Sequence, residues 1–417
     1  MEYRINRVRL EKNLYELAKI GKNATGGIDR FLSSKADQQA REWILDYWKK
    51  HLDITITIDG IANMWALAKG EKELPPIVFG SHHDAVPNGG MFDGALGVLL
   101  ATEILETLQE NGVKTKHPFA LVSFTGEEPN PFNVSTLGSK VLSGRLVTED
   151  LEKLSSYLDG SSLQDCMEKI GGDLKQTGDM KIKEGQIRAF LECHIEQGSR
   201  LVDKGLTTSA VSCITGIYRE NVEVVGEANH AGTTIMPRRH DALTAASEFA
   251  LAFEQMIREQ QADDIVGTIG YFNVFPNSAN IIPGKVTLTM EIRTCDGAIT
   301  KSLAGKLDGI CKGIEEKRGV KINRTVNLDQ KEMPLDADIQ KYVLEAMKEL
   351  GEGETSLVSM AGHDAANMQR VTKSGMIFTQ SEQGKSHCPE EYTSMEAIEK
   401  TGNCMLLALL KMDQGLD

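Results

Sequence analysis

The sequence lacks long apolar runs, has few cysteines and is short of positive charge, and each shortage excludes a class of protein. No stretch of about 18 apolar residues occurs, so no segment is expected to cross a bilayer. The seven cysteines are scattered, odd in number and without a Cys-x-x-Cys pair, which predicts reduced thiols and no disulfide framework. Lys and Arg total 46 against 60 Asp and Glu, a net charge of −14. Neither nucleic acid nor a membrane surface is therefore an expected partner.

The first residues also lack the apolar core of a signal peptide, which favours a cytoplasmic location. With 417 residues, 41% hydrophobic and 25% charged, the composition is that of a soluble globular protein. A chain of this length exceeds one ordinary core, so we expect more than one domain.

The hydrophobic pattern predicts an α/β fold, in which a mixed, largely parallel sheet is flanked by helices. Apolar runs at 77–79, 119–124 and 188–195 indicate buried strands, and the stripe from Asp93 to Gly112 indicates a helix between the first two. The pattern then changes: a strand, a helix, two strands, a helix and a strand follow between 216 and 328. This order is typical of a ferredoxin-like α+β unit. We therefore predict a catalytic domain of 1–212 and 330–417, with an inserted domain of 213–329.

Histidine and acidic residues lie at or just after the ends of these predicted strands, or head the helix that follows. In an open α/β sheet such side chains converge on one crevice. Imidazole nitrogen and carboxylate oxygen suit zinc, manganese and similar ions, so the set indicates a two-metal site. Taken singly, each has a plainer interpretation: a loop histidine, a solvated Glu-Glu pair, or Asp93 as a helix N-cap. The residues are His82, Asp84, Asp93, Glu127, Glu128, His194 and His387.

Eight sequence blocks, in order, resemble the hydantoinase/carbamoylase-type amidases, which include N-carbamoyl-L-amino acid hydrolases, allantoate amidohydrolases and ureidopropionases. The resemblance extends over about residues 10–410 and also links the chain to two-metal aminoacylases and carboxypeptidases. The blocks are GSHHDAVPNGGMFDGALGV, GEEPNPF, HIEQG, ANHAGTT, NSANIIPG, EIR, AGHDA and KSHCPEE.

The resemblance implies the role of each candidate metal ligand. His82 and His194 bind one divalent ion, Glu128 and His387 bind the other, and Asp93 bridges them. The ions are manganese or zinc, with cobalt or nickel as alternatives. Asp84 hydrogen-bonds His82 and fixes its tautomer. Glu127 is the general base that takes a proton from the attacking water and delivers it to the leaving nitrogen.

The resemblance also assigns the substrate contacts and the role of the inserted domain. His230 stabilises the tetrahedral oxyanion, reaching a site across a homodimer formed through the inserted lid domain. Asn277 and Arg293 hold the substrate carboxylate, for which the planar guanidinium is well suited. An ion pair on a strand surface is the plainer role for Arg293, and a helix cap is the plainer role for His363 and Asp364. The expected substrate-binding residues are Gln197, Asn277, Asn280, Arg293, Gly362 and His363.

The chain departs from the family pattern at several positions near these motifs. His83 takes a usually apolar place, and we expect it to pack behind the metal site rather than add a polar contact. Pro129, Asn130 and Pro131 replace a common Gly-Ser-Arg run, which stiffens the loop after Glu128 and can alter the pocket wall. The remaining departures are Ile235 for a common Pro, Met360 for a common Gly, and Cys388 beside His387, which we interpret as a neighbour and not a ligand.

The expected activity is hydrolysis of an N-carbamoyl-L-amino acid to the amino acid, carbon dioxide and ammonia. Allantoate is the nearest alternative substrate, because it also joins a ureido group to a carboxylate. A dipeptidase or aminoacylase activity is less favoured, since EIR and NSANIIPG fit the ureido amidases better. An inactive metal-binding scaffold is a further alternative, but a purely structural metal site needs no base such as Glu127.

Overall fold

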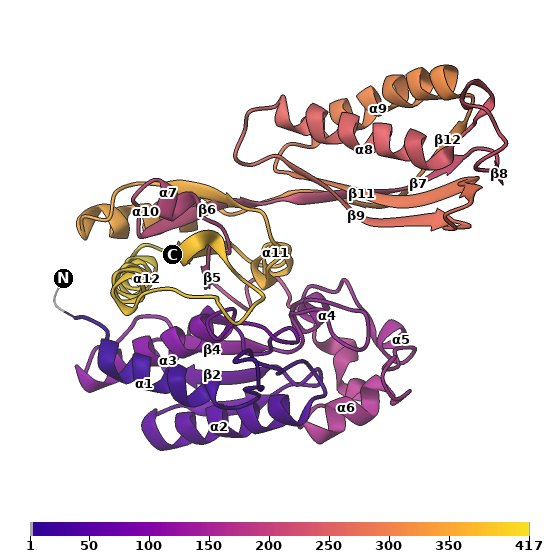
Figure 1. Ribbon diagram of the computed structural model, residues 1–417. Helices are drawn as coiled ribbons and strands as arrows, with labels where there is room; N and C mark the ends of the chain where they lie inside the picture. Colours follow the sequence, from indigo (N-terminus) through magenta and orange to yellow (C-terminus); the bar gives the residue numbers. More distant parts are fainter. Residues whose placement is uncertain (1–2, 417) are drawn as a thin grey trace. The chain divides into compact units, whose positions relative to one another are not determined.

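The computed structural model describes residues 3–416, which form two compact units, one of residues 3–212 and 335–416 and the other of residues 213–334 (Figure 1). The first unit contains a nine-stranded sheet with the strand order β1-β2-β4-β3-β5-β15-β6-β13, and β14 pairs with β6. Its strands are β1 (Thr55–Ile58), β2 (Met64–Ala68), β3 (Ile77–His82), β4 (Phe119–Phe124), β5 (Ala189–Ile195), β6 (Thr208–Ile214), β14 (Ser356–Ser359) and β15 (Ser374–Thr379), with β13 (Met333–Pro334) at the end of the second unit.

The four central strands of this sheet are parallel. β3 pairs with β4 and β5, and β5 pairs with β15, all in the parallel sense, whereas the outer pairs are antiparallel. Every residue of these four strands is buried, as expected for parallel strands covered on both faces. The prediction of an α/β fold with a mixed sheet is confirmed.

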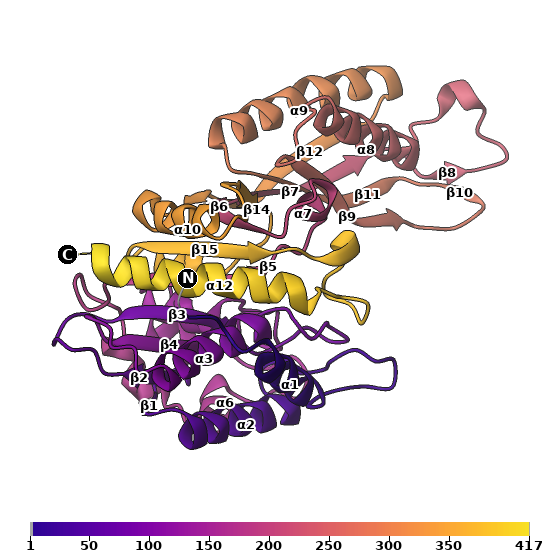
Figure 2. The ribbon, with the colours of Figure 1, turned by 90° about the vertical axis from the view of Figure 1, so that its left-hand side faces the viewer.

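Helices cover both faces of the main sheet, and α1, α3 and α12 lie in front of its strands in Figure 2. Five of the ten α-helices of this unit begin at a side chain that accepts a backbone N–H, such as Ser34 before α2 and Ser394 before α12. None of the helices in residues 3–416 combines the length and apolarity that a membrane crossing requires. The helices of this unit are α1 (Arg7–Ala18), α2 (Lys35–His51), α3 (Ala95–Glu110), α4 (Leu137–Leu142), α5 (Thr148–Leu151), α6 (Leu163–Lys169), α7 (Arg200–Asp203), α10 (Ala337–Glu349), α11 (Asp364–Met368) and α12 (Met395–Gly415), with short 3-10 turns at η1 (Leu174–Asp179) and η3 (Glu382–Gly384).

The second unit is a four-stranded antiparallel sheet with two helices packed on one of its faces. Its strand order is β12-β7-β11-β9, and apolar side chains of α8 and α9 form the core with the sheet. Along the chain the elements follow as strand, helix, strand, strand, helix, strand, which is the split βαβ order. They are β7 (Gly216–Val225), α8 (Ala242–Arg258), β9 (Val266–Phe275), β11 (Lys285–Thr294), α9 (Gly297–Arg318) and β12 (Lys321–Gln330), with the short pair β8 (Asn229–His230) and β10 (Ile281–Ile282) and the 3-10 turn η2 (Met236–Arg238).

Candidate metal centre

The chemically important side chains of the first unit lie at the carboxyl ends of its parallel strands. His82 is the last residue of β3, His194 lies near the end of β5, and Glu127 and Glu128 follow β4. His387 follows β15, the next parallel strand along the sheet. Because parallel strands end at the same edge, residues distant in sequence are brought together there.

Two groups of donor atoms share the carboxylate of Asp93, one through each oxygen. Asp93 Oδ1 lies 3.4 Å from His82 Nε2 and 3.2 Å from His194 Nε2. Asp93 Oδ2 lies 3.4 Å from His387 Nε2, which in turn is 3.3 Å from Glu128 Oε1. A carboxylate that faces a different group through each oxygen has the geometry of a bridging ligand.

These separations fit metal coordination. Ligand atoms about 2.0–2.2 Å from one ion in a tetrahedral arrangement lie about 3.3–3.6 Å from one another, which is close to the spacing in both groups. Glu128 Oε1 is buried and accepts no hydrogen bond from any described residue, so a lone pair is left for a cation. The nitrogen and oxygen donors suit divalent ions of the zinc and manganese kind. The residues present therefore fit divalent metal binding.

The electrostatics of the cluster indicate an excess of buried negative charge. Burial raises the pKa of Glu127 well above its ordinary range, and the nearby Glu128 and Asp364 carboxylates add to this effect. The nearby Asp93 and Glu128 carboxylates raise the pKa of His387 to about 11. Burial alone would raise the pKa of Asp93, but the three imidazoles hold it well below its usual value. A divalent cation would offset the charge of carboxylates buried together in this way.

Asp93 is held in place from both sides. Gln197 Nε2 and Ser386 Oγ donate to Asp93 Oδ2 at 2.6 and 3.0 Å, and Glu391 Oε1 accepts the backbone N–H of Asp93 at 3.0 Å. Gly94, which follows it, has φ +61°, and a Cβ at that position would lie 2.2 Å from the His82 ring. Asp93 does not cap α3: the N-cap position is taken by Gly94, and no side chain caps this helix.

Ser386 and Glu391 were not among the predicted site residues. Ser386 Oγ bridges Asp93 Oδ2 and Glu391 Oε2, at 3.0 and 2.8 Å. Both residues lie close to His387 in the KSHCPEE block, and this proximity is the only sequence signal that could have indicated them. Their contacts with Asp93 cross almost 300 residues of chain.

Asp84 contacts the loop of Glu127 and Glu128 as well as His82. Its carboxylate accepts the backbone N–H groups of Glu127 and Glu128 at 3.3 and 3.1 Å. His82 Nδ1 lies 3.1 Å from the main-chain oxygen of Asp84 and 3.4 Å from its Oδ1. His82 Nδ1–H therefore has an acceptor at Asp84, which leaves Nε2 facing Asp93.

The segment with Gly362 and His363 also lies beside this cluster. The His363 ring is buried, 4.5 Å between centroids from the His194 ring, and its Nε2 lies 2.8 Å from Ser359 Oγ. His363 occupies the N-cap position of α11 without a side-chain cap bond, and Asp364 accepts from Ser139 Oγ instead. Neither side chain acts as a helix cap.

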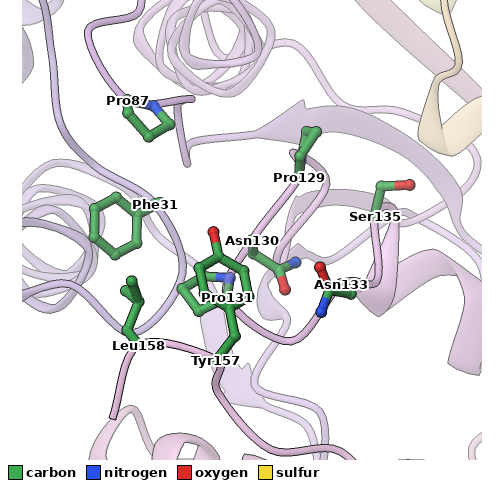
Figure 3. A pocket seen from close by; sticks show the side chains of 9 residues that line it. All are labelled: Phe31, Pro87, Pro129, Asn130, Pro131, Asn133, Ser135, Tyr157 and Leu158. Atoms are coloured by element: carbon green, nitrogen blue, oxygen red, sulfur yellow. The ribbon is translucent and has the colours of Figure 1, made fainter. Parts of the chain in front are cut away.

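The loop after Glu128 forms one wall of a mostly apolar cavity of about 450 Å³. Pro129 and Pro131 line it together with Phe31, Pro87 and Tyr157 (Figure 3). Asn130 braces the loop, because its Nδ2 donates to the Glu128 carbonyl at 3.2 Å. The proline-rich run thus contributes to a pocket wall that begins one residue after Glu128.

His83 is buried, but it does not pack as an apolar residue. Its Nε2 lies 3.0 Å from Asp37 Oδ1, and its Nδ1 lies 2.7 Å from Ser123 Oγ. The expectation that His83 would pack without adding a polar contact was wrong. The polar partner of His83 is an acid 46 residues earlier in the chain, and no local sequence pattern indicates such a contact.

In the second unit, His230 and the segment with Asn277 and Asn280 lie side by side. His230 pairs with Ile281, and the Asn280 carbonyl accepts the Ala231 N–H at 3.0 Å. Arg293 lies near the far end of β11, where its Nε donates to Glu291 Oε1 at 2.6 Å. Asn277 lies at the other end of the sheet, because Phe275, two residues before it, pairs with Lys285 at the start of β11. Arg293 is about 27 Å along the strand from Lys285, at about 3.4 Å per residue.

Comparison with known families gives this arrangement its context. The pattern of the family described as "Peptidase family M20/M25/M40" matches residues 78–411, a range that contains every residue of both donor groups. The chain belongs to this peptidase family. Membership of M20/M25/M40 and the donor cluster together indicate binding of divalent metal.

Relatives within the family confirm the resemblance to hydantoinase/carbamoylase-type amidases. The chain is 32% identical to the N-carbamoyl-L-amino acid amidohydrolase of Geobacillus stearothermophilus, covering 93% of this chain and 94% of that protein. It is 33% identical to the ureidoglycolate hydrolase of Arabidopsis thaliana, covering 97% and 86%. A hydantoinase/carbamoylase family amidase from Burkholderia multivorans is similar in structure, with a TM-score of 0.92, 31% identity and coverage of 99% and 98%.

Proposed function

We propose that this M20-family chain is a dinuclear metal-dependent amidohydrolase that cleaves the ureido C–N bond of N-carbamoyl-L-amino acids. The products are the amino acid, carbon dioxide and ammonia. The observation that carries the proposal is that two donor groups share Asp93, while Glu127 lies beside them and belongs to neither. The name of the Geobacillus relative supports the substrate class.

The chain's own residues divide into ligands and a base. His82 and His194 would hold one ion, Glu128 and His387 the other, and Asp93 both. Bound divalent ions would lower the pKa of a coordinated water and polarise the ureido carbonyl. Glu127 Oε2 lies 3.7 Å from His82 Nε2, next to the ligands, so its carboxylate is placed to take the proton of the attacking water and return it to the leaving nitrogen.

His230 is prepared to donate a hydrogen bond. Its Nδ1 accepts the backbone N–H groups of Gly232 and Thr233 at 3.0 and 3.2 Å. In the neutral ring the proton is then on Nε2, which is the form that donates to an oxyanion. His230 is exposed on its unit, as such a role requires.

The distance along β11 supports a homodimer with shared sites. Arg293 and Asn277 lie at opposite ends of one sheet, so one chain cannot present both to the same carboxylate. We infer that one chain supplies Arg293 to a substrate while its partner supplies Asn277, Asn280 and the oxyanion donor His230. Gln197, Gly362 and His363 would complete the pocket.

The edge strand β9 is a suitable surface for such a dimer. It is the last strand of its sheet, and Tyr271, Phe272 and Phe275 on it are 51%, 39% and 44% exposed. An exposed apolar edge strand tends to pair with another chain unless it is covered. A second copy of the same strand would cover it.

The substrate class can be tested by measuring ammonia release. Purified protein loaded with manganese or zinc should release ammonia from N-carbamoyl-L-amino acids and lose this activity after chelation. Dipeptides and N-acyl amino acids, which release no ammonia on cleavage, are followed by amine detection as controls. Release from allantoate alone would select the alternative substrate, which carries a ureido group and a carboxylate, as does the ureidoglycolate in the plant relative's name. Absence of turnover on every ureido substrate would contradict the proposal.

Shared sites lead to a subunit-complementation prediction. Arg293→Ala should raise KM for carboxylate substrates strongly and leave the stability of the fold nearly unchanged, because the guanidinium contacts the substrate carboxylate. His230→Ala should lower kcat instead. When the two variants are unfolded, mixed in equal amounts and refolded, random pairing should restore activity to about one quarter of all sites, since half of the dimers are mixed and each mixed dimer has one intact site. Refolded mixtures no more active than the separate variants would exclude shared sites.

A further inference from the structure

A buried polar network lies behind the metal centre and is centred on Asp37, near the start of α2. Asp37 and His83 are fully buried, and Arg41 is 3% exposed. Asp37 Oδ1 accepts from Arg41 Nε at 3.1 Å and from His83 Nε2 at 3.0 Å. Since an ionised carboxylate only accepts, His83 Nε2 donates, and His83 Nδ1 then accepts from the Ser123 hydroxyl at 2.7 Å.

The network reaches the ends of two neighbouring strands. His83 lies between His82 and Asp84, just after β3, and Ser123 is the penultimate residue of β4. Arg41 extends the contact to the loop after β4, where its Nη2 donates to Thr125 Oγ1 at 3.1 Å. Thr125 precedes Glu127 by two residues.

A second buried arginine fixes the same segment through its backbone. Arg30 is 1% exposed and donates through Nε to the His83 carbonyl at 2.7 Å. Its Nη1 also donates to the Leu17 carbonyl in the last turn of α1 and to the Ile20 carbonyl just after the helix. The residue next to His82 is therefore held by both its side chain and its main chain.

These contacts fix the end of β3 relative to the loop after β4. The β3 end carries the candidate ligand His82, and the loop after β4 carries Glu127 and Glu128. Direct hydrogen bonds from Asp84 tie these segments together on the metal side. The Asp37 network ties them together a second time, through side chains of α2.

We propose that His83, with Asp37 and Arg41, is a positioning residue that sets the placement of His82 and Glu127 in the metal centre. The expected change in kcat rests on the proposed function, whereas the expected change in metal binding does not. His83 touches neither substrate nor metal in this assignment. It acts through the backbone of its neighbours. Substitution of residues that orient a ligand typically costs about 10–100-fold in metal affinity or activity.

The test replaces His83 by Leu, which removes both hydrogen bonds of the ring and leaves the Asp37–Arg41 pair intact. We expect kcat to fall by at least about tenfold while KM changes by less than about twofold, because ligand and base geometry is altered but substrate contacts are not. The visible absorption of the cobalt-loaded protein should change, and cobalt should bind more weakly. His83→Gln can still donate to Asp37 and should retain a kcat within about threefold of wild type.

Glu103→Gln is the matched control for loss of a buried polar contact. Glu103 is 2% exposed and accepts from Arg9 Nε at 2.6 Å, but it lies ten residues beyond Asp93, about 15 Å along the chain at about 1.5 Å per residue of helix. The melting temperature of the Glu103→Gln protein should fall, while its kcat and cobalt spectrum stay unchanged. If His83→Leu fails to fold, Ser123→Ala removes only the hydroxyl that contacts Nδ1 and should change the spectrum and kcat in the same direction.

The possible outcomes separate the two proposals. A folded His83→Leu protein with the wild-type cobalt spectrum and kcat would overturn the positioning role, as would an equal loss in Glu103→Gln. If wild-type protein hydrolyses no ureido substrate, the proposed function fails. The cobalt spectrum and affinity of the variants would then still decide whether His83 positions the centre.

Discussion

Replacing Glu127 by Gln is expected to reduce turnover by a factor of about 10²–10⁴ while fold and metal content stay as in wild type. The amide has the same shape as the carboxylate but cannot accept the proton of the attacking water. Glu127 belongs to neither donor group, so its substitution removes no candidate ligand. Ammonia release gives the rate, elemental analysis gives the metal content, and thermal unfolding checks the fold.

The neighbouring acid provides the control for this experiment. Glu128→Gln changes the same loop by the same chemistry, but Glu128 is in a donor group, at 3.3 Å from His387. It should lose metal together with activity, whereas Glu127→Gln should lose activity alone. Substantial activity in Glu127→Gln would show that the base is another group.

Replacing Asp93 by Ala should have the largest effect on metal content, because each of its oxygens faces a separate donor group. We expect the protein to lose both divalent ions after dialysis. His82→Ala and His387→Ala each disrupt only one group and should each retain about one ion per chain at moderate metal concentration. Elemental analysis of dialysed protein, with metal titration by calorimetry, measures the stoichiometry.

The Glu103→Gln protein serves again as the remote control and should keep full metal content. In wild type, chelation should abolish activity, and manganese or zinc should restore it. If Asp93→Ala retained as much metal as His82→Ala, Asp93 would not be shared between two ions. A single tightly bound ion in wild type would likewise contradict the dinuclear assignment.

The parallel centre of the fold could be predicted from the sequence because buried parallel strands leave a local signal. The runs at 77–79, 119–124 and 188–195 are continuously apolar, and the observed strands β3, β4 and β5 contain no exposed residue. The acids and histidines that follow these runs could be recognised for the same reason. Strands β6 and β14 and helix α12 lie outside the elements expected from the sequence.

The amino-acid sequence by itself determined the α/β class, the candidate ligands and the family, because apolar runs and motif blocks are local properties of the chain. Only the tertiary structure decided which oxygen of Asp93 faces which histidines, that Ser386 and Glu391 hold Asp93, and that His83 pairs with Asp37. It also placed Arg293 and Asn277 at opposite ends of one sheet. These features depend on strand register and on contacts between segments far apart in sequence, and such contacts exist only once the sheet and its covering helices have packed.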